Sequence, residues 1–386
     1  MSKLEELIQQ YCPDGVEYNQ LKNILKIRNG KDYKHLDNGT IPVYGSGGVM
    51  TYVDTSIYDK PSVLIPRKGS IDKLYYVDVP FWNVDTVFYT EINKSLVIEK
   101  YVFYALQKEH LEKLNTAGGV PSLTQAVLND VVIPVPPLPV QEEIVRILDI
   151  FTELQAELQA ELQKRKSQYS YYLDNLLSFN KWGGQTGVRW MRMSEAFEIR
   201  NGYTPSKANK EFWEGGTIPW FRMEDIRQNG RILSDSILHI TPKGVKGKGL
   251  FKANSFILAT TATIGEHALL IADSLANQRF TNLSIRKSLE NEIDVKFFYY
   301  YMFKIDEWCK SNTNISNFAS VDMTKFCKLL IPIPSMTELK RIAEILDRFD
   351  RLTNDLSSGL PAEMKKRRQQ YEYYRDKLLS FKRKGA

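Results

Sequence analysis

The sequence predicts an α+β protein: two mixed α/β domains joined by two long antiparallel, coiled-coil-like helices, with an internal pseudo-twofold repeat. The first observation is a proline-rich hinge, Ile133-Pro134-Val135-Pro136, which recurs as Ile331-Pro332-Ile333-Pro334. The second is that each copy leads into a long stretch in which apolar residues return every three or four positions, as on one face of a helix. Both stretches end in Leu-Leu-Ser-Phe, at residues 176–179 and 378–381. The chain is therefore two copies of one unit.

The domains that precede the long helices also begin alike. Gly15-Val16-Glu17-Tyr18 recurs as Gly187-Val188-Arg189-Trp190, and Ile27-Arg28-Asn29-Gly30 recurs as Ile199-Arg200-Asn201-Gly202. In both cases the copies are 172 residues apart. Between the matched ends the β-rich regions differ freely, which indicates two modules of one shape with different specificities.

Four segments follow from this repeat. Residues 1–138 form the first domain, which starts with a short helix, and residues 139–180 form the first long helix. Residues 181–335 form the second domain, and residues 336–386 form the second long helix with a basic tail.

Smaller elements fill each domain. Short β-rich runs bounded by turn residues predict a small mixed sheet over residues 41–89, and helical spacing predicts a helix over residues 99–114. In the second domain the same plan predicts strands at residues 218–221 and 256–259 and a helix over residues 295–310.

We expect the two long helices to pack against each other. About forty residues at about 1.5 Å per residue give a helix of about 60 Å, and its apolar stripe requires a partner. The second helix supplies one, and a pseudo-twofold axis makes the two antiparallel. Ser357-Ser358-Gly359-Leu360-Pro361 interrupts the second helix, because Pro361 has no N–H to donate to the carbonyl of Ser357. We therefore predict a kink or a break there.

Charge is distributed unevenly. Residues 1–180 hold 18 Lys and Arg against 23 Asp and Glu, a net charge of −5, whereas residues 181–386 hold 34 against 23, a net charge of +11. A basic excess is typical of a nucleic-acid partner, but only half of the chain has one, so charge alone leaves nucleic-acid binding an even choice. The absence of a long apolar run, the acidic N-terminus and the three scattered cysteines predict a cytoplasmic protein without membrane contact.

Enzyme signatures are missing from the sequence. It contains no Asn/Asp-Pro-Pro-Tyr/Phe tetrapeptide of a DNA methyltransferase and no P-loop. Gly45-Ser46-Gly47-Gly48 does not lie between a strand and a helix, and Asp294-Val295-Lys296 lacks the upstream acid of a nuclease. The four histidines share no metal-ligand spacing. We therefore predict a non-catalytic protein.

Polar loops supply the candidate binding residues, although such loops are also ordinary solvent-exposed turns. Turns near residues 67–70 and 261–265 combine polar side chains with a glycine that permits close approach, and the Lys/Gly-rich loop 243–249 suits phosphate groups. Asn and Arg at residues 277–279 and Asn at 312–314 have the side chains that pair with base edges. The candidate DNA-binding residues are Lys31, Tyr44, Ser46, Arg67, Lys68, Ser70, Thr116, Tyr203, Lys207, Arg222, Lys246, Lys248, Thr261, Thr263, Asn277, Arg279, Asn312 and Asn314.

As a joint pattern these motifs resemble the specificity subunit of type I restriction–modification enzymes. The resemblance covers essentially the whole chain. It rests on the duplicated Ile-Pro-x-Pro, on Ile-Leu-Asp-x-Phe at residues 147–151 and 345–349, and on the terminal Leu-Leu-Ser-Phe. The Gly-Val-x-aromatic starts and Pro121-Ser122-Leu123 add to it.

The resemblance implies a sequence-specific DNA-binding subunit of a multisubunit complex, in which each of two target-recognition domains reads one half of a bipartite site in double-stranded DNA. It implies two methyltransferase (M) subunits that use S-adenosylmethionine, and restriction (R) subunits that use ATP and Mg, as partners. It also implies no cofactor in this chain. A helix of about 60 Å would hold the two readers more than one DNA turn, about 34 Å, apart and so set the gap.

Two points stay open at this stage. Either the acidic first domain gathers Lys31, Lys34, Arg67 and Lys68 on one face, or the M subunits supply most phosphate contacts. The alternative function is a non-catalytic protein–protein scaffold with two ligand-binding modules, which a gel shift on mixed DNA would distinguish.

Overall fold

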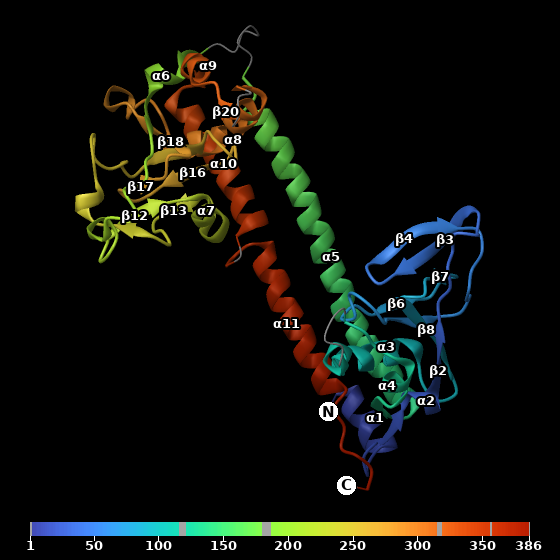
Figure 1. Ribbon diagram of the computed structural model, residues 1–386. Coiled ribbons are helices and arrows are strands. Elements are labelled where there is room, and N and C mark those ends of the chain that lie inside the picture. The colour runs from blue at the N-terminus through green and yellow to red at the C-terminus, as the bar shows by residue number, and fades with distance from the viewer. Residues whose placement is uncertain (1, 116–120, 180–186, 315–318, 356, 386) are drawn as a thin grey trace. The chain divides into compact units, whose positions relative to one another are not determined.

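The computed structural model describes residues 2–115, 121–179, 187–314, 319–355 and 357–385 (Figure 1). The chain divides into two compact units: unit 1 contains residues 1–161 and 361–386, and unit 2 contains residues 162–360. Each unit combines one α/β domain with parts of the long helices. Helix α5 (Leu138–Leu176) contributes to both units.

In unit 1 the strands between residues 25 and 92 form two sheets, whereas the sequence predicted one mixed sheet over residues 41–89, and that prediction is wrong. The first sheet is antiparallel, in the order β2-β8-β5-β6, and the second is mixed, in the order β4-β3-β7. The β3–β4 hairpin pairs with itself and with β7, and it has its own small core of Val43, Val53 and Trp82. The strands are β2 (Leu25–Asn29), β3 (Asn38–Gly45), β4 (Gly48–Val53), β5 (Ser62–Pro66), β6 (Tyr75–Val77), β7 (Trp82–Asn83) and β8 (Val87–Ile92).

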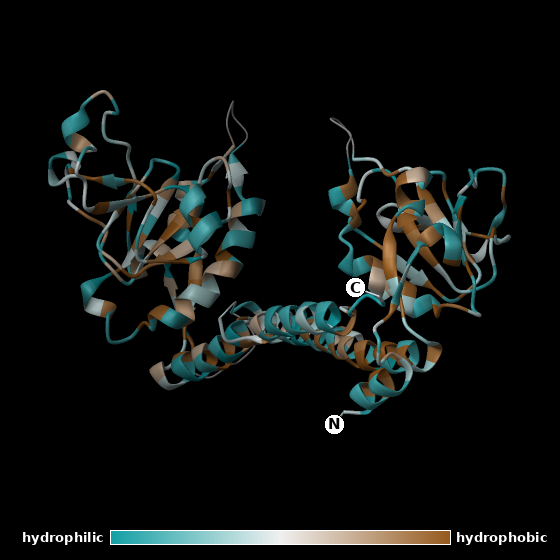
Figure 2. Ribbon diagram, turned by 90° about the horizontal axis from the view of Figure 1, so that it is seen from below, coloured by the Kyte–Doolittle hydropathy of each residue, from teal (hydrophilic) through white to brown (hydrophobic). Residues whose placement is uncertain are grey.

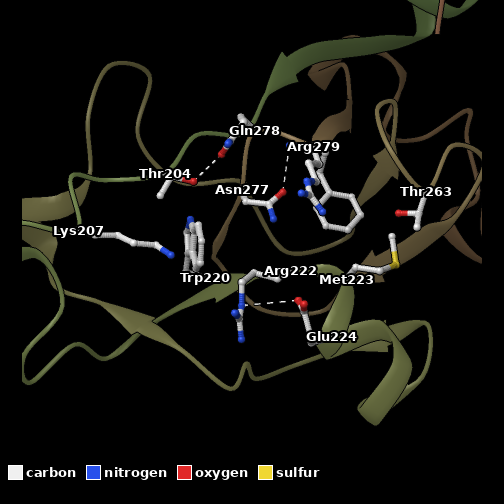
Figure 3. Close-up of a pocket in the computed structure, with 11 residues that line it drawn as sticks. Thr204, Lys207, Trp220, Arg222, Met223, Glu224, Thr263, Asn277, Gln278 and Arg279 are labelled. Atoms are coloured by element: carbon white, nitrogen blue, oxygen red, sulfur yellow. Dashed lines mark hydrogen bonds and ion pairs between the residues drawn. The ribbon is translucent and has the colours of Figure 1, made fainter. Parts of the chain in front are cut away.

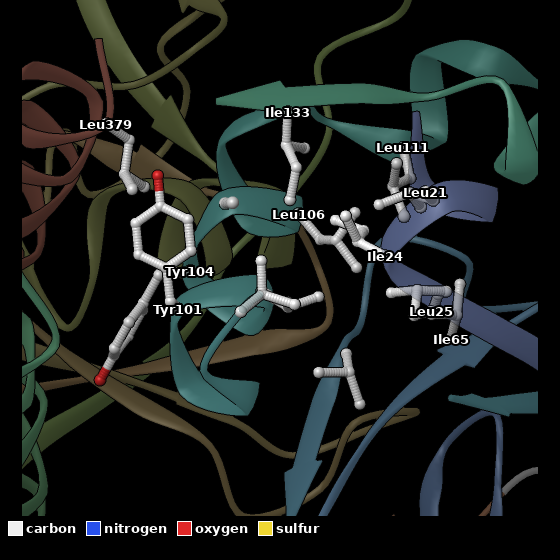
Figure 4. Close-up of a cluster of buried hydrophobic side chains, with 14 of the residues drawn as sticks. Leu21, Ile24, Leu25, Ile65, Tyr101, Tyr104, Leu106, Leu111, Ile133 and Leu379 are labelled. Carbon is white, nitrogen blue, oxygen red and sulfur yellow. The ribbon is translucent and has the colours of Figure 1, made fainter. Parts of the chain in front are cut away.

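Helices cover the four-stranded sheet of unit 1. The predicted N-terminal helix is confirmed as α1 (Lys3–Tyr11), where Ser2 and Glu5 form a capping box. The predicted helix over residues 99–114 is interrupted: α3 (Glu99–Lys108) ends before His110, whose φ is +50°, and a 3₁₀ helix follows at Leu111–Leu114. This turn directs Leu111 into the same core as Leu106, Ile65 and Ile133 (Figure 4). Two short helices complete the unit, α2 (Leu21–Ile24) and α4 (Gln125–Asn129).

Unit 2 follows the same plan with more strands. Its main sheet has the order β11-β18-β15-β16-β13, its second sheet the order β14-β12-β17, and a small pair joins β19 and β20. The predictions for residues 218–221, 256–259 and 295–310 are confirmed as β12, β15 and α8. The strands are β11 (Phe197–Asn201), β12 (Ile218–Phe221), β13 (Ile232–Leu233), β14 (His239–Ile240), β15 (Ser255–Ala259), β16 (His267–Leu270), β17 (Leu275–Ala276), β18 (Phe280–Ile285), β19 (Thr313–Asn314) and β20 (Ser320–Val321). The helices are α6 (Met193–Ala196), α7 (Met223–Asn229), α8 (Val295–Ser311), α9 (Met323–Lys328) and 3₁₀ turns at Lys210–Phe212, Pro242–Gly244 and Lys287–Leu289.

The proline-rich segments, expected to be hinges, are strands. In unit 1, β9 (Val132–Val135) pairs with β1 (Glu17–Gln20), and in unit 2, β21 (Leu330–Ile333) pairs with β10 (Arg189–Arg192). Each pair is a separate two-stranded sheet, in which a proline that lacks an N–H is tolerated. The matched start and end of each domain therefore meet where a long helix begins.

The first long helix is confirmed as one uninterrupted helix of 39 residues. Within each unit α5 runs antiparallel to a neighbouring helix (Figure 1), and its aromatic side chains stack on that neighbour. In unit 1, Phe151 stacks on Tyr374 of α11 (Leu360–Leu378), with ring centroids 5.4 Å apart. In unit 2, Tyr172 stacks on Phe349 of α10 (Met336–Asn354), with centroids 5.1 Å apart. Hydrophobic residues gather on the inner strands and helices of each domain (Figure 2).

The predicted break in the second long helix is confirmed. Helix α10 ends at Asn354, and α11 begins at Leu360. Pro361 thus lies in the first turn of α11, where no N–H is needed. Among the described helices, none is long and apolar enough to cross a bilayer.

Glu143, near the start of α5, makes the stability of unit 1 sensitive to acid. Its side chain is only 3% exposed, and its carboxylate lies 2.6 Å from Arg146 and 2.9 Å from Lys3 of α1. The hydrogen bond from Arg146 is the largest cause that lowers the pKa of Glu143 from 4.5 to about 2. A lowered pKa in the folded state contributes stability above the unfolded pKa and loses it as pH falls through the folded pKa.

We therefore expect the free energy of unfolding of unit 1 to decrease between pH 4.5 and about 2, measured by urea denaturation at fixed pH. Glu143→Gln should reduce this slope, whereas Glu142→Gln, at an exposed neighbouring position, should leave it unchanged. Equal slopes in all three proteins would contradict the assignment.

Candidate nucleic-acid interface

The same four chain segments meet at one end of the domain in each unit. They follow β2, β3 and β5 and precede β8 in unit 1, and they follow β11, β12 and β15 and precede β18 in unit 2. The same backbone hydrogen bonds hold them: Val84 N donates to Tyr44 O at 3.0 Å, and Asn277 N donates to Phe221 O at 3.0 Å. Both units thus present their loops on one frame.

The repeated Ile-Arg-Asn-Gly explains how tightly these segments pack. A Cβ atom on Gly30 would lie 2.1 Å from Val84 O, and one on Gly202 would lie 2.3 Å from Asn277 O. Neither glycine is needed for a positive φ. Glycine is needed because the strand end lies directly against the turn before β8 or β18.

In unit 2 this end of the domain carries a pocket of about 280 Å³ (Figure 3). Five sequence-predicted residues line it together: Lys207, Arg222, Thr263, Asn277 and Arg279. They come from four different segments of the chain, so the fold brings them together. The remaining lining residues are Thr204, Trp220, Met223, Glu224, Gln278 and Phe280.

Two cations of this pocket are available to a ligand. Arg279 and Lys207 are exposed, and within the described ranges their side chains make no hydrogen bond or ion pair. Arg222 is half-buried and lies 3.8 Å from Glu224, and its Nε is buried without a hydrogen-bond acceptor. Asn277 Oδ1 accepts from Arg279 N at 3.0 Å, which shapes the turn that presents Arg279. The pocket therefore combines free positive charge with amide and hydroxyl groups.

Sequence reasoning missed the other pocket residues. Gln278 lies inside the polar run that was singled out, so this run was the signal for it. Trp220 is buried at 2% exposure and donates from Nε1 to Tyr203 O at 3.0 Å, which looks like core packing from the sequence. Met223 and Glu224 begin α7, a helix whose counterpart is absent from the described part of unit 1.

The basic loop of unit 2 is anchored by a predicted tyrosine. Tyr203 OH donates to Gly244 O at 3.2 Å and accepts from Lys246 N at 2.6 Å. Lys246 and Lys248 line a second depression of about 300 Å³ beside Tyr203. The Nζ of Lys248 lies 3.5 Å from Glu198, so this cation is partly neutralised.

The other predicted residues of unit 2 lie outside the pocket lining. The backbone of Thr261 forms an isolated β-bridge with Ser320, and Asn314 of β19 is the strand partner of Ser320 of β20. The Asn312 amide donates to Trp308 O at 2.9 Å, which closes the end of α8. Asn312 therefore serves the local fold in this structure.

Unit 1 presents phenols and lysines at the equivalent place. Tyr75 OH donates to Ser46 O at 3.0 Å, and the rings of Tyr44 and Tyr75 lie 5.9 Å apart. Burial raises the pKa of both phenols, so each hydroxyl stays protonated at neutral pH. Gly69 adjoins this cluster, since a Cβ there would lie 3.2 Å from Ser46 Oγ.

The predicted cations of unit 1 have different environments. Lys31 N donates to Asn83 O at 2.9 Å, and Tyr203 N makes the equivalent contact with Ala276 O in unit 2, also at 2.9 Å. The side chain of Lys68 is exposed, and its backbone forms an isolated β-bridge with Ser122, as the backbone of Thr261 does with Ser320. Arg67 is half-buried over the ring of Phe88, 4.9 Å from its centroid. Ser70 accepts from Lys73 N through its carbonyl, and Thr116 lies outside the described residues.

In the part of the chain that the structure describes, no group of three His, Cys, Asp or Glu residues is placed to hold a metal ion. The geometry thus defines a class of protein with two copies of one α/β domain, each of which has a polar loop surface and is attached to a long helix.

The chain belongs to the type I restriction–modification DNA specificity family. The family model, described as the type I restriction modification DNA specificity domain, matches residues 13–165 and 187–366. The EcoR124I/EcoR124II specificity subunit of Escherichia coli is 34% identical over 99% of this chain and 97% of its own length. The EcoprrI specificity subunit of the same species is 52% identical over 202 residues, half of each chain.

Solved structures share the fold. The S subunit of a type I restriction–modification system from M. genitalium has a TM-score of 0.57 at 16% identity and covers 95% of this chain and 96% of that chain. A chain from a structural study of complex assembly in the type I system has a TM-score of 0.63 at 14% identity and covers 95% of this chain and 98% of that chain. The resemblance seen in the sequence is confirmed. The chain is a non-catalytic DNA-recognition component of a restriction–modification complex.

Proposed function

We propose that each domain is a target-recognition domain that reads one half of a bipartite site in double-stranded DNA. The unit 2 pocket carries this proposal, because Lys207 is brought beside Asn277 and Arg279 of a distant turn, and these side chains offer free hydrogen-bonding groups. Arg pairs with guanine and Asn or Gln with adenine in the major groove, so this set suits base-edge reading. The loop lysines Lys246 and Lys248 suit the flanking phosphates.

Unit 1 reads its half with fewer cations. Tyr44, Ser46, Lys68 and Ser70 form its candidate surface, and Lys31 occupies the position of Tyr203. Arg67 packs on Phe88 and contributes less free charge. Of the two alternatives for the acidic first domain, this supports the one in which the M subunits supply most of the phosphate contacts.

The long helices set the gap and dock the partners in this proposal. Residues 139–180 and 336–386 act as the spacer, and residues 1–138 and 181–335 act as the readers. Two M subunits that carry S-adenosylmethionine bind the spacer, and R subunits that use ATP and Mg complete a cytoplasmic complex. Both long helices carry Tyr-x-Tyr-Tyr, at residues 169–172 and 371–374. The second tyrosine of each is exposed, Tyr171 at 65% and Tyr373 at 62%, which supports a docking surface for a partner.

Mapping of methylated adenines in cells that carry this chain with its methyltransferase tests the function. We expect one bipartite motif with a fixed gap. A continuous motif, or methylation that is unchanged when this chain is removed, would refute the proposal.

Replacement of the exposed tyrosines tests the docking surface. Tyr171→Ala and Tyr373→Ala remove large exposed rings, so each should weaken methyltransferase binding about tenfold or more while the melting temperature stays unchanged. Isothermal titration calorimetry with purified methyltransferase measures the affinity of each variant for that partner. Tyr11→Ala, at an exposed tyrosine of α1, is the matched control. Unchanged affinity in both spacer variants would place the docking surface elsewhere.

A further inference from the structure

The aspartate of Ile-Leu-Asp-x-Phe joins the domain of unit 1 to the long helix. Asp149 lies on α5 and accepts from two side chains of α3. Lys100 Nζ lies 2.7 Å from Asp149 Oδ2, and Tyr104 OH donates to Oδ1 at 2.6 Å. Lys100 and Tyr104 are four residues apart, one helical turn, so both reach the same carboxylate.

Unit 2 makes the same contact with the matching residues. Asp347 on α10 accepts from Lys296 Nζ through Oδ2 and from Tyr300 OH through Oδ1, the latter at 2.6 Å. Lys296 and Tyr300 occupy on α8 the positions of Lys100 and Tyr104 on α3. The two attachments therefore agree atom for atom.

Other contacts between the domain and the long helix differ between the units. Gln141 of α5 donates to Leu96 O at 2.9 Å and accepts from Ile98 N at 2.9 Å, whereas buried Leu339 occupies its place on α10. Gln107 accepts from Tyr371 OH, whereas Phe303 in its place packs on His267. The aspartate contact is thus retained between surroundings that diverged.

The tyrosine side of the contact is buried, whereas the lysine side is more open, with Lys100 37% and Lys296 66% exposed. Tyr104 is 3% exposed and Tyr300 is 2% exposed, and burial is the largest cause that raises the pKa of both phenols, so both remain donors at neutral pH. A rotation of α3 about its axis, or a slip by one turn along α5, would break both bonds to Asp149. The two charge-assisted hydrogen bonds therefore fix the rotation of the domain helix, α3 in unit 1 and α8 in unit 2, about its own axis and its position along the long helix.

The domain helix in turn supports the reading loops. In unit 1, α3 packs on β5, which leads into the loop of Lys68 and Ser70, and Lys100 also lies over the ring of Tyr76 in β6 at 5.7 Å. In unit 2, Phe297 and Phe298 of α8 share a core with β15, which leads into the loop of Thr263.

We propose that Asp149 and Asp347 are positioning residues, which set the orientation of each reading domain on its long helix and thereby the register between half-site and gap. The inference rests on the proposed function. It predicts that loosening the contact relaxes the choice of gap length without changing the bases preferred in either half-site.

Methylation of a set of DNA duplexes tests this. Each duplex carries both wild-type half-sites with the wild-type gap, or with one base pair more or fewer. Because a misplacement of about 1 Å costs about a hundredfold in rate, the wild-type complex should discriminate strongly between gaps. We compare the methylation rate at the wild-type gap with the rate at an altered gap. In Asp149→Asn and in Asp347→Asn this ratio should fall by about tenfold or more, while the preference for the bases of each half-site is retained.

Two further variants separate positioning from folding. Tyr104→Phe keeps the ring and the Lys100 bond, so it should relax the gap choice less than Asp149→Asn and stay folded if that variant does not. Glu338→Gln removes an ion pair to Arg341 inside α10 at 2.6 Å and should leave the ratio unchanged.

An equal loss of rate at every gap, with an unchanged ratio, would mean that the aspartates support folding alone and would overturn the inference. If the wild-type complex methylates no bipartite site, the proposed function fails and the inference fails with it. A bipartite site together with an unchanged ratio in the folded variants refutes the positioning role alone.

Discussion

Arg279→Ala is expected to weaken binding to the unit 2 half-site by about 1–3 kcal/mol, or about tenfold to a hundredfold, because a bidentate guanidinium contact to guanine has this value. The unit 1 half-site should keep its preference. The side chain of Arg279 is exposed and makes no hydrogen bond or ion pair among the described residues, so its truncation should leave the fold intact. Competition binding with duplexes randomised in one half at a time measures the effect.

Two control variants sharpen this experiment. Arg279→Lys keeps the charge but loses the planar fork, so general affinity should survive while base preference at one position is lost. Arg348→Ala removes an exposed arginine of α10, away from the pocket, and should change neither half-site. If Arg279→Ala binds its half-site with unaltered preference, the pocket is not the reader of unit 2.

Leu148→Ala is expected to lower the free energy of unfolding of unit 1 by about 2–5 kcal/mol, because it removes a fully buried side chain and leaves a cavity. Leu148 is 0% exposed and belongs to the same core as Ile144 and Tyr101. Ile150→Ala is the matched control on the same helix, since Ile150 is 53% exposed and its truncation should change the free energy by about 0.5 kcal/mol or less.

Chemical denaturation that follows the transition of unit 1 gives both values. Similar losses in the two variants would show that α5 is not held to the domain through its Leu148 face.

The sequence predicted the features that depend on local pattern. The repeat, the uninterrupted first helix and the break near Pro361 follow from periodicity and from the missing proline N–H, and the structure confirms them. The division of unit 1 into two sheets escaped prediction, because the two residues of β7 take their strand character from tertiary pairing with β3. The left-handed His110 had no signal, since glycine is the usual residue there.

The candidate site was predictable in part for a related reason. Arg279 and Asn277 have side chains whose chemistry is legible in a sequence, and they line the pocket. Trp220 and Glu224 join them only through the pairing of distant strands. Asp149 likewise meets Lys100, 49 residues away in the chain, so only the repeat of its motif marked it beforehand.

The strand pairs β1–β9 and β10–β21 have a consequence for inheritance. Each domain starts and finishes in one two-stranded sheet, and the two halves of the chain share Gly-Val just before the first strand of this sheet and Ile-Pro within the second. A genetic exchange with crossovers in these shared stretches replaces everything between them as one cassette and leaves the helix junction intact. If each domain reads one half-site as proposed, such an exchange would change one half-site and leave the other domain unaltered.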